Sequence, residues 1–208
     1  MQSWTIDQTK ILTRDEIARV LADLNRRGRR SRNSRQNLII FRLATCCGLR
    51  VSELIGLNLG DVRIGVDRPY LYVRKETAKR HKPRRVALWW DGGTLADITM
   101  WRDERVLQGA GPGDPFVCVQ SRRSPGNRLD RFSARARFKV ACRVLGPDRL
   151  RELTIHHGRH SFVSHALAAG RTLAEVRDAA GHANIATTSI YAHTTDDVGK
   201  VGNMFGVA

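Results

Sequence analysis

Apolar residues recur every three or four positions along several stretches of the chain, which is the spacing of one face of an α-helix. The first stretch follows Thr13-Arg14-Asp15-Glu16, a capping box in which the threonine hydroxyl accepts from the backbone three residues on and the glutamate reaches back. Its apolar positions are Ile17, Val20, Leu21 and Leu24. Residues 38–45 are apolar enough for a buried helix that ends near Gly48, and Ser52 is suited to cap a short helix through Leu57. The arginine-rich segment up to Arg35 is either a loop or the polar start of the second helix.

Two short runs, Leu71-Tyr72-Val73 and Val86-Ala87-Leu88, predict the strands of a hairpin joined by a basic, polar segment. Helical spacing predicts further helices around residues 95–106, 132–144 and 162–167. The apolar face of the second of these is marked by Phe132, Ala136, Val140 and Val144. A second capping box, Thr172-Leu173-Ala174-Glu175, begins a short helix that ends at Gly181, and a last helix is expected to carry Ile190 and Tyr191. The expected fold is mainly α with a small antiparallel β-sheet (α+β).

The charge of the chain indicates that it binds a negatively charged partner. The 208 residues carry a net charge of +16, and the excess is clustered. Residues 26–35 hold six arginines, residues 74–85 hold seven basic residues and one acid, and residues 122–143 hold eight and one. Three such clusters favour a nucleic acid over a merely solvated surface or an anionic membrane, although charge does not separate DNA from RNA.

Composition also excludes several classes of protein. No apolar run approaches the roughly 20 residues that a membrane span needs, and the N-terminus lacks the pattern of a secretory signal. The expected location is therefore the cytoplasm, on the nucleoid when DNA is bound. The cysteines have no C-x-x-C spacing, so we expect reduced, buried thiols, no metal site and no cofactor. They are Cys46, Cys47, Cys118 and Cys142.

A few polar residues have the chemistry to attack a phosphodiester. Arg50 and Arg159 offer permanently charged forks of donors for the phosphate oxygens, where negative charge accumulates during attack. His156 and His182 can donate a hydrogen bond or move a proton near neutral pH. Tyr191 is the candidate nucleophile; a phenol with a pKa of about 10 needs a nearby base or a positive field. Taken singly, each of these residues is more often structural, so the hypothesis depends on their order and surroundings.

The departing deoxyribose oxygen is a poor leaving group and needs a proton. A lysine of the hairpin is suited to supply it, and Lys79 is preferred over Lys75 and Lys82. The resulting phosphotyrosyl bond would keep the energy of the phosphodiester, so a second DNA hydroxyl can reverse the step without ATP.

Four segments resemble the motifs of one known family. Cys47-Gly48-Leu49-Arg50-Val51-Ser52-Glu53-Leu54-Ile55-Gly56-Leu57 resembles T-G-L-R-x-S-E-L-x-x-L, and residues 78–88 resemble a hairpin whose catalytic lysine falls on Lys79. His156-His157-Gly158-Arg159-His160-Ser161-Phe162 resembles H-x-L-R-H-[ST]-F, and Ala180-Gly181-His182 with Thr187-Thr188-Ser189-Ile190-Tyr191 resembles L-G-H-x-x-x-x-T-x-x-Y. From about Leu12 to about His193 the chain resembles the catalytic domain of the tyrosine recombinase (phage-integrase) family, with all six active-site positions present.

The resemblance implies a role for each of these positions. Arg50 and Arg159 would clamp the scissile phosphate, Lys79 would protonate the leaving 5′ oxygen, and His156 would assist proton transfer. His182 would bond the phosphate, and Tyr191 would join the DNA 3′ phosphate. Glu53 would steady the site, either through Arg50 or as a carboxylate at a helix start, and His160 would be structural. Further DNA contacts are expected from Lys75, Arg80, Lys82, Arg84 and Arg85.

The chain also departs from the family pattern. Gly158 stands where leucine is usual, which is expected to remove a packing contact and loosen the helix start, and Ala180 replaces another leucine. We expect an N-terminal extension over residues 1–11, a catalytic domain over residues 12–193 and a tail over residues 194–208, without a separate core-binding domain. The chain is then either naturally minimal or truncated. The tail is expected either to anchor a neighbouring subunit or to be a frayed terminus. Its candidate anchor residues are the apolar Val201, Met204, Phe205 and Val207.

Three functions remain in competition at this point. The resemblance favours a site-specific DNA recombinase or integrase that needs neither a metal ion nor ATP. Such an enzyme is expected to act on double-stranded DNA as a homo-tetramer, and to be either a tetramer or a monomer when free of DNA. A type IB topoisomerase would share the phosphotyrosyl chemistry, and a non-catalytic DNA-binding module would explain a helix-turn-helix over residues 172–193. The target sequence and the biological role (integration, cassette exchange, transposition or resolution) are not encoded in these motifs.

Overall fold

The N-terminal part of the chain forms the predicted pair of helices. The computed structural model describes residues 7–78, 82–121 and 125–191. After a 3-10 turn, η1 (Gln8–Lys10), the first helix, α1 (Arg14–Gly28), begins with the predicted capping box, in which Thr13 Oγ1 accepts from Glu16 N at 3.1 Å. The second, α2 (Arg32–Thr45), is buried along most of its length because it packs against α1, α5 and α7. The arginine-rich segment therefore spans the end of one helix and the start of the next.

The small sheet has one strand more than the sequence predicted. The hairpin strands β2 (Tyr70–Val73) and β3 (Arg84–Ala87) pair antiparallel, with Leu71 opposite Val86. A two-residue strand, β1 (Val62–Arg63), adds to the other edge of β2 and follows the 3-10 turn η2 (Leu59–Asp61). The helix α3 (Val51–Gly56) precedes η2 in the chain. Its N-cap is Arg50 and not Ser52 as predicted, because the Glu53 carboxylate accepts the Arg50 backbone N–H at 2.8 Å.

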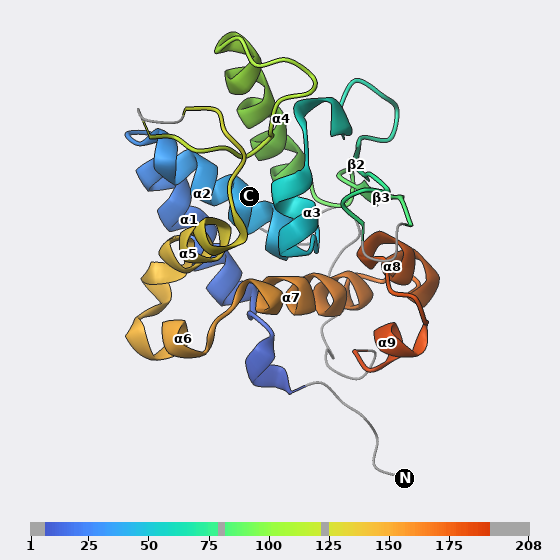
Figure 1. Ribbon diagram of the computed structural model, residues 1–208. Coiled ribbons are helices and arrows are strands. Elements are labelled where there is room, and N and C mark those ends of the chain that lie inside the picture. The colour runs from blue at the N-terminus through green and yellow to red at the C-terminus, as the bar shows by residue number, and fades with distance from the viewer. Residues whose placement is uncertain (1–6, 79–81, 122–124, 192–208) are drawn as a thin grey trace.

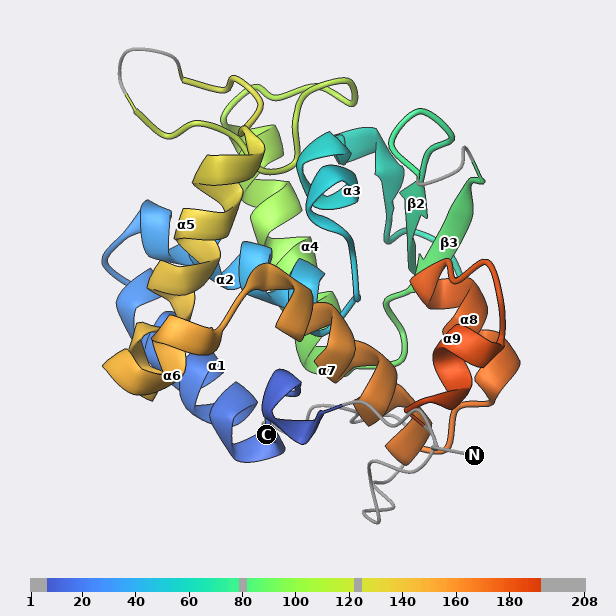
Figure 2. The same ribbon diagram turned by 60° about the horizontal axis from the view of Figure 1, so that its bottom comes forward.

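The remaining helices are α4 (Gly92–Leu107), α5 (Arg131–Ala141), the 3-10 turn η4 (Cys142–Leu145), α6 (Pro147–Glu152), α7 (Ile155–Ala168), α8 (Leu173–Ala180) and α9 (Ala186–Ser189). In Figure 1, α7 runs between the group of α1, α2, α5 and α6 and the side of the molecule that carries the sheet, α8 and α9. Figure 2 shows α8 beside β3, in agreement with their contacts.

Two predictions about these helices were wrong. On α5 the predicted apolar face is the exposed one, since Phe132 is 81% exposed, Val140 is 45% exposed, and Ala136 is also exposed. The helix instead buries Ala134, Phe138 and Ala141, with Phe138 stacked on Phe41 of α2. The last helix, α9, ends at Ser189, so Ile190 and Tyr191 follow it and are not part of it.

Gly158 has a different effect from the expected one. It lies where α7 crosses α2, and a Cβ added to it would stand 2.8 Å from Thr45 Oγ1 and 3.2 Å from the Ala44 carbonyl carbon. The missing side chain therefore lets the two helices approach closely and does not loosen the helix start. The family leucine would not fit between α2 and α7 as they are packed here.

We expect Gly158→Leu to destabilise the protein. Overpacking a core costs about 1–3 kcal/mol, which exceeds the gain of roughly 0.8 kcal/mol in helix propensity when glycine is replaced. Urea unfolding should show a lower midpoint, and Thr45→Ala in the same chain should restore part of the loss by making room. A midpoint equal to or above that of the unsubstituted protein would contradict the close helix contact.

Candidate active site

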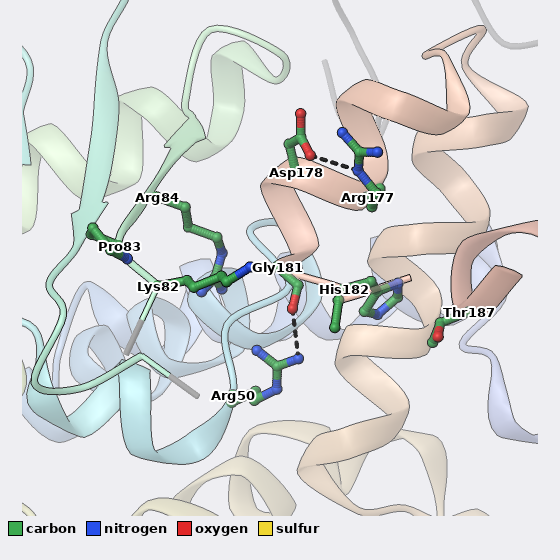
Figure 3. Close-up of a pocket in the computed structure, with 10 residues that line it drawn as sticks. Arg50, Lys82, Pro83, Arg84, Arg177, Asp178, Gly181, His182 and Thr187 are labelled. Atoms are coloured by element: carbon green, nitrogen blue, oxygen red, sulfur yellow. Dashed lines mark hydrogen bonds and ion pairs between the residues drawn. The ribbon is translucent and has the colours of Figure 1, made fainter. Parts of the chain in front are cut away.

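The carboxyl end of α8 is the meeting point of three arginine side chains from other elements. Three successive carbonyl oxygens, those of residues 179–181, accept from Arg84 Nε at 2.8 Å, from Arg159 Nη2 at short range, and from Arg50 Nη2 at 3.0 Å. The last of these bonds is drawn in Figure 3. A helix end carries unpaired carbonyls and a partial negative charge, so cations are favoured there. The residue that follows, His182, is thereby fixed next to the arginines.

One buried carboxylate holds two of these arginines. Glu53 is 1% exposed; its Oε1 accepts from Arg50 Nη1 at 3.0 Å, and both its oxygens accept from Arg84 at 2.8 Å. Burial pushes the pKa of Glu53 up, but the hydrogen bonds and charges of Arg84 and Arg50 outweigh it and leave the pKa below its ordinary value. Glu53 is therefore ionised at neutral pH. The expected contact between Glu53 and Arg50 is present in the structure.

Arg84, an expected DNA contact, is largely engaged within the protein. Its side chain is 9% exposed, and its guanidinium is held by Glu53 and by the end of α8. The same residue still lines the pocket described below. Arg85, the next residue, is exposed and lies over the Tyr70 ring at 4.7 Å.

Arg159 is the most deeply placed cation of the group. It is 7% exposed, and Nη1 donates to Gly48 O at 2.6 Å. Burial, with the neighbouring charge of Arg50, lowers the pKa of Arg159 to about 9, so it remains protonated at neutral pH. Gly48 has φ of +63°, and a Cβ there would stand 2.3 Å from a ring carbon of Phe162. Only glycine brings this carbonyl to the guanidinium.

His182 and His156 are both neutral imidazoles at pH 7. Burial, then the charges of Arg159 and Arg50, lowers the pKa of His182 to about 3. Its Nδ1 lies 3.0 Å from Thr188 Oγ1, and when that hydroxyl donates, Nε2 carries the proton and can donate to a phosphate oxygen. The pKa of His156 is lowered by burial and by Arg135 and Arg159.

The Tyr191 hydroxyl points to His160, a residue that was expected to be structural. His160 Nδ1 lies 2.5 Å from the Tyr191 oxygen, and the two rings stack with centroids 5.9 Å apart. Tyr191 is 4% exposed, and burial raises its pKa to about 12 although Arg159 draws it down. Burial lowers the pKa of His160 to about 4, so the contact joins two neutral groups. The signal available in the sequence was that His160 lies one helical turn after His156 and next to Arg159.

A pocket of about 520 Å³ opens over the end of α8 (Figure 3). Its lining includes Arg50, Lys82, Arg84, Gly181, His182 and Thr187. Tyr191 and Arg159 are not part of this lining. The arrangement offers the guanidinium groups of Arg50 and Arg84, an ammonium group and a neutral imidazole to an anion, while the phenol is held on His160 outside the lining.

Some predicted residues lie elsewhere. Lys79 and Arg80 are outside the described residues, as is the tail with its apolar positions; Lys75 is exposed at the turn after β2. The four cysteines are buried, and burial raises the pKa of Cys46 to about 11 and that of Cys142 to about 12. Within the described ranges, no group of three or more His, Cys, Asp or Glu side chains could hold a metal ion, and no helix is long and apolar enough to cross a bilayer.

The mainly helical fold with its small antiparallel sheet is the fold of tyrosine recombinase and integrase catalytic domains. The chain belongs to the phage integrase family, whose sequence model matches residues 10–197. Tyrosine recombinase XerC of Herpetosiphon aurantiacus is 34% identical over 152 residues, which cover 72% of this chain and 45% of the relative. Tyrosine recombinase XerA of Pyrococcus horikoshii is 30% identical over 186 residues, covering 89% and 57%. The chain thus spans about half the length of these curated relatives.

A solved structure supports the fold. XerH site-specific recombinase, in a post-cleavage complex with its palindromic difH substrate, superposes with a TM-score of 0.68 at 21% identity, covering 89% of this chain and 50% of that one.

We expect Arg84→Gln to lower the free energy of unfolding by about 3 kcal/mol at pH 7, the lower end of the range for breaking a buried ion pair, because Arg50 still faces Glu53. The folded-state pKa of Glu53 is depressed, so its stabilisation is present above the ordinary value of 4.5 and is lost as the pH falls through the folded value. The difference between the two proteins should therefore shrink below pH 4.5. Chemical unfolding at several pH values measures it, with Arg85→Gln on the exposed face of β3 as the matched control. If both variants lose the same small amount of unfolding free energy, Arg84 does not stabilise the site as proposed.

Proposed function

We propose that this chain cleaves and rejoins double-stranded DNA through a 3′-phosphotyrosyl intermediate, as a site-specific recombinase or integrase. The observation that carries the proposal is the convergence of Arg50, Arg159 and His182 on the end of α8, beside Tyr191, in a member of the phage integrase family. The names of its relatives, tyrosine recombinases, and a related structure in complex with its substrate support DNA as the substrate.

In this proposal the scissile phosphate enters the pocket and replaces water around the guanidinium groups. Charge grows on the non-bridging oxygens during attack, and Arg50 and the Nε2 proton of His182, which line the pocket, stabilise that charge more than they stabilise the ground state. Arg159 lies outside this lining and adds its charge from there until the substrate draws it in. No metal ion is needed for this step, since permanent cations already surround the oxygens.

The covalent step forms one bond and breaks one. The Tyr191 oxygen bonds to phosphorus, the bond from phosphorus to the 5′ oxygen breaks, the phenol proton passes to a neutral imidazole of the site, and the 5′ oxygen gains a proton. By family resemblance, Lys79 gives that proton and His156 assists the transfer. Tyr191 must first leave His160, because the pocket lining does not include it. The same groups run the reverse step with a second strand as the nucleophile, which needs no ATP.

We further propose that protomers act as a tetramer on two duplexes and separate when free of DNA. Family catalysis of strand exchange needs sequential cleavage in paired duplexes, which one protomer cannot supply. The proposed DNA contacts of the hairpin are Lys75, Arg80, Lys82, Arg84 and Arg85. The proposed compartment of action is the one that holds the cell's DNA.

The direct test is covalent trapping with a nicked suicide substrate whose released strand diffuses away. We expect an SDS-resistant adduct with the unsubstituted protein and none with Tyr191→Phe, while DNA affinity changes by less than about threefold, because the ring still packs. Tyr72→Phe, at an exposed tyrosine of β2, is the matched control and should form the adduct normally.

Each other outcome assigns a different function. No adduct from any DNA by the unsubstituted protein, with binding intact, would identify a DNA-binding module. Relaxation of supercoiled plasmid lacking any specific site would identify a topoisomerase of type IB.

A further inference from the structure

A second cationic pocket lies directly beside the first and shares Arg50 with it. This cavity, of about 560 Å³, lies between α3, the start of α5 and the turn after β2. Its lining is Arg50, Ser52, Ile55, Gly56, Arg74, Glu76, Thr77, Ala78, Arg128 and Arg131. Arg50 lines both pockets and therefore forms part of the wall of each. The catalytic proposal does not use the other arginines of this second pocket.

The positive charge of the second pocket is only partly balanced. Arg74 pairs with Asp61 at 3.0 Å and donates to Gly56 O at 2.6 Å. Arg128 donates to two neutral oxygens, Ile55 O and Asn58 Oδ1, each at 2.6 Å. Burial, followed by repulsion from Arg74, lowers the pKa of Arg128 even though Asp61 attracts it. Two guanidinium groups are thus held close enough to repel each other.

Arg131 adds a cation that is free to adapt to a ligand. It is exposed, it is the first residue of α5, and the N-cap of that helix, Asp130, is occupied in accepting from Ser133 N at 2.7 Å. Glu76 is the one acidic residue among the lining side chains named above. A cavity built in this way favours a singly charged anion with several oxygens, and guanidinium forks match a phosphodiester.

We propose that this second pocket binds a backbone phosphate of the cleaved DNA strand within two positions of the scissile phosphate. This inference rests on the proposed function for its position along the strand. Phosphates on one strand advance only about 3.4 Å each along the helix axis, so a strand whose scissile phosphate lies on one side of Arg50 passes its neighbours along the other side. The phosphate contact fixes the register of the strand over the active site and carries no base specificity.

The test neutralises one partner at a time. Binding is measured on Tyr191→Phe protein, which separates affinity from cleavage, with Arg131→Gln added and duplexes that carry a single methylphosphonate at each position near the cleavage site. We expect Arg131→Gln to weaken binding roughly tenfold and to lower the salt dependence by about one phosphate, a slope change of ~0.9. Arg151→Gln, at an exposed arginine of α6, is the matched control and should change neither.

The double-mutant cycle decides the outcome. A methylphosphonate within two positions of the scissile phosphate should weaken binding of the parent roughly tenfold and weaken binding of Arg131→Gln clearly less, because one of the arginines facing that phosphate is already gone. Additive losses at every position, or coupling only at a distant phosphate, would overturn the proposed pocket. If the protein forms the adduct but this coupling is absent, the phosphate site in the second pocket is wrong and the proposed catalysis stands. If the coupling is present but no adduct forms, the proposed catalysis is wrong and the phosphate site stands.

Discussion

The site depends on three guanidinium groups being held at the carboxyl end of one short helix. Arg50, Arg84 and Arg159 carry three positive charges, opposed by the carboxylate of Glu53 and by the roughly half charge of the end of α8. The group therefore keeps an excess of about one and a half positive charges in a largely buried place. A phosphodiester is the kind of ligand that neutralises this excess, and it does so more fully as its oxygens gain charge during attack.

The proposed nucleophile, Tyr191, lies outside the pocket that these charges line. Tyr191 is buried against His160, and burial holds its pKa near 12, which makes the phenol a poor nucleophile where it stands. Moving its oxygen toward Arg159 would bring the phenolate into a positive field and lower that pKa. The helix before it, α9, has four residues, so little regular structure opposes the change. In the proposed mechanism, the tyrosine can attack only after substrate binding has brought the Tyr191 oxygen and the Arg159 guanidinium closer together.

Local patterns in the sequence predicted the local structure well, and tertiary contacts explain what they missed. The capping box at Thr13 and the hairpin strands depend on neighbours in the chain, so residue order alone reveals them. The exposed face of α5 was misassigned because Phe132 follows the helical period without facing the core. The ion pair of Arg84 with Glu53 was not foreseen, because the two residues lie 31 positions apart in the chain. The family motifs supplied the candidate reactive residues, but the contact of His160 with the tyrosine needed the fold.

The most direct measurement is a crystal structure of the protein with nicked DNA and orthovanadate, which mimics the five-coordinate phosphorus of the transition state. We expect vanadium bonded to the Tyr191 oxygen, with Arg50 and Arg159 donating to its equatorial oxygens and His182 Nε2 within hydrogen-bond distance. Vanadate bound elsewhere, or a Tyr191 hydroxyl still on His160 while vanadate fills the arginine pocket, would contradict it.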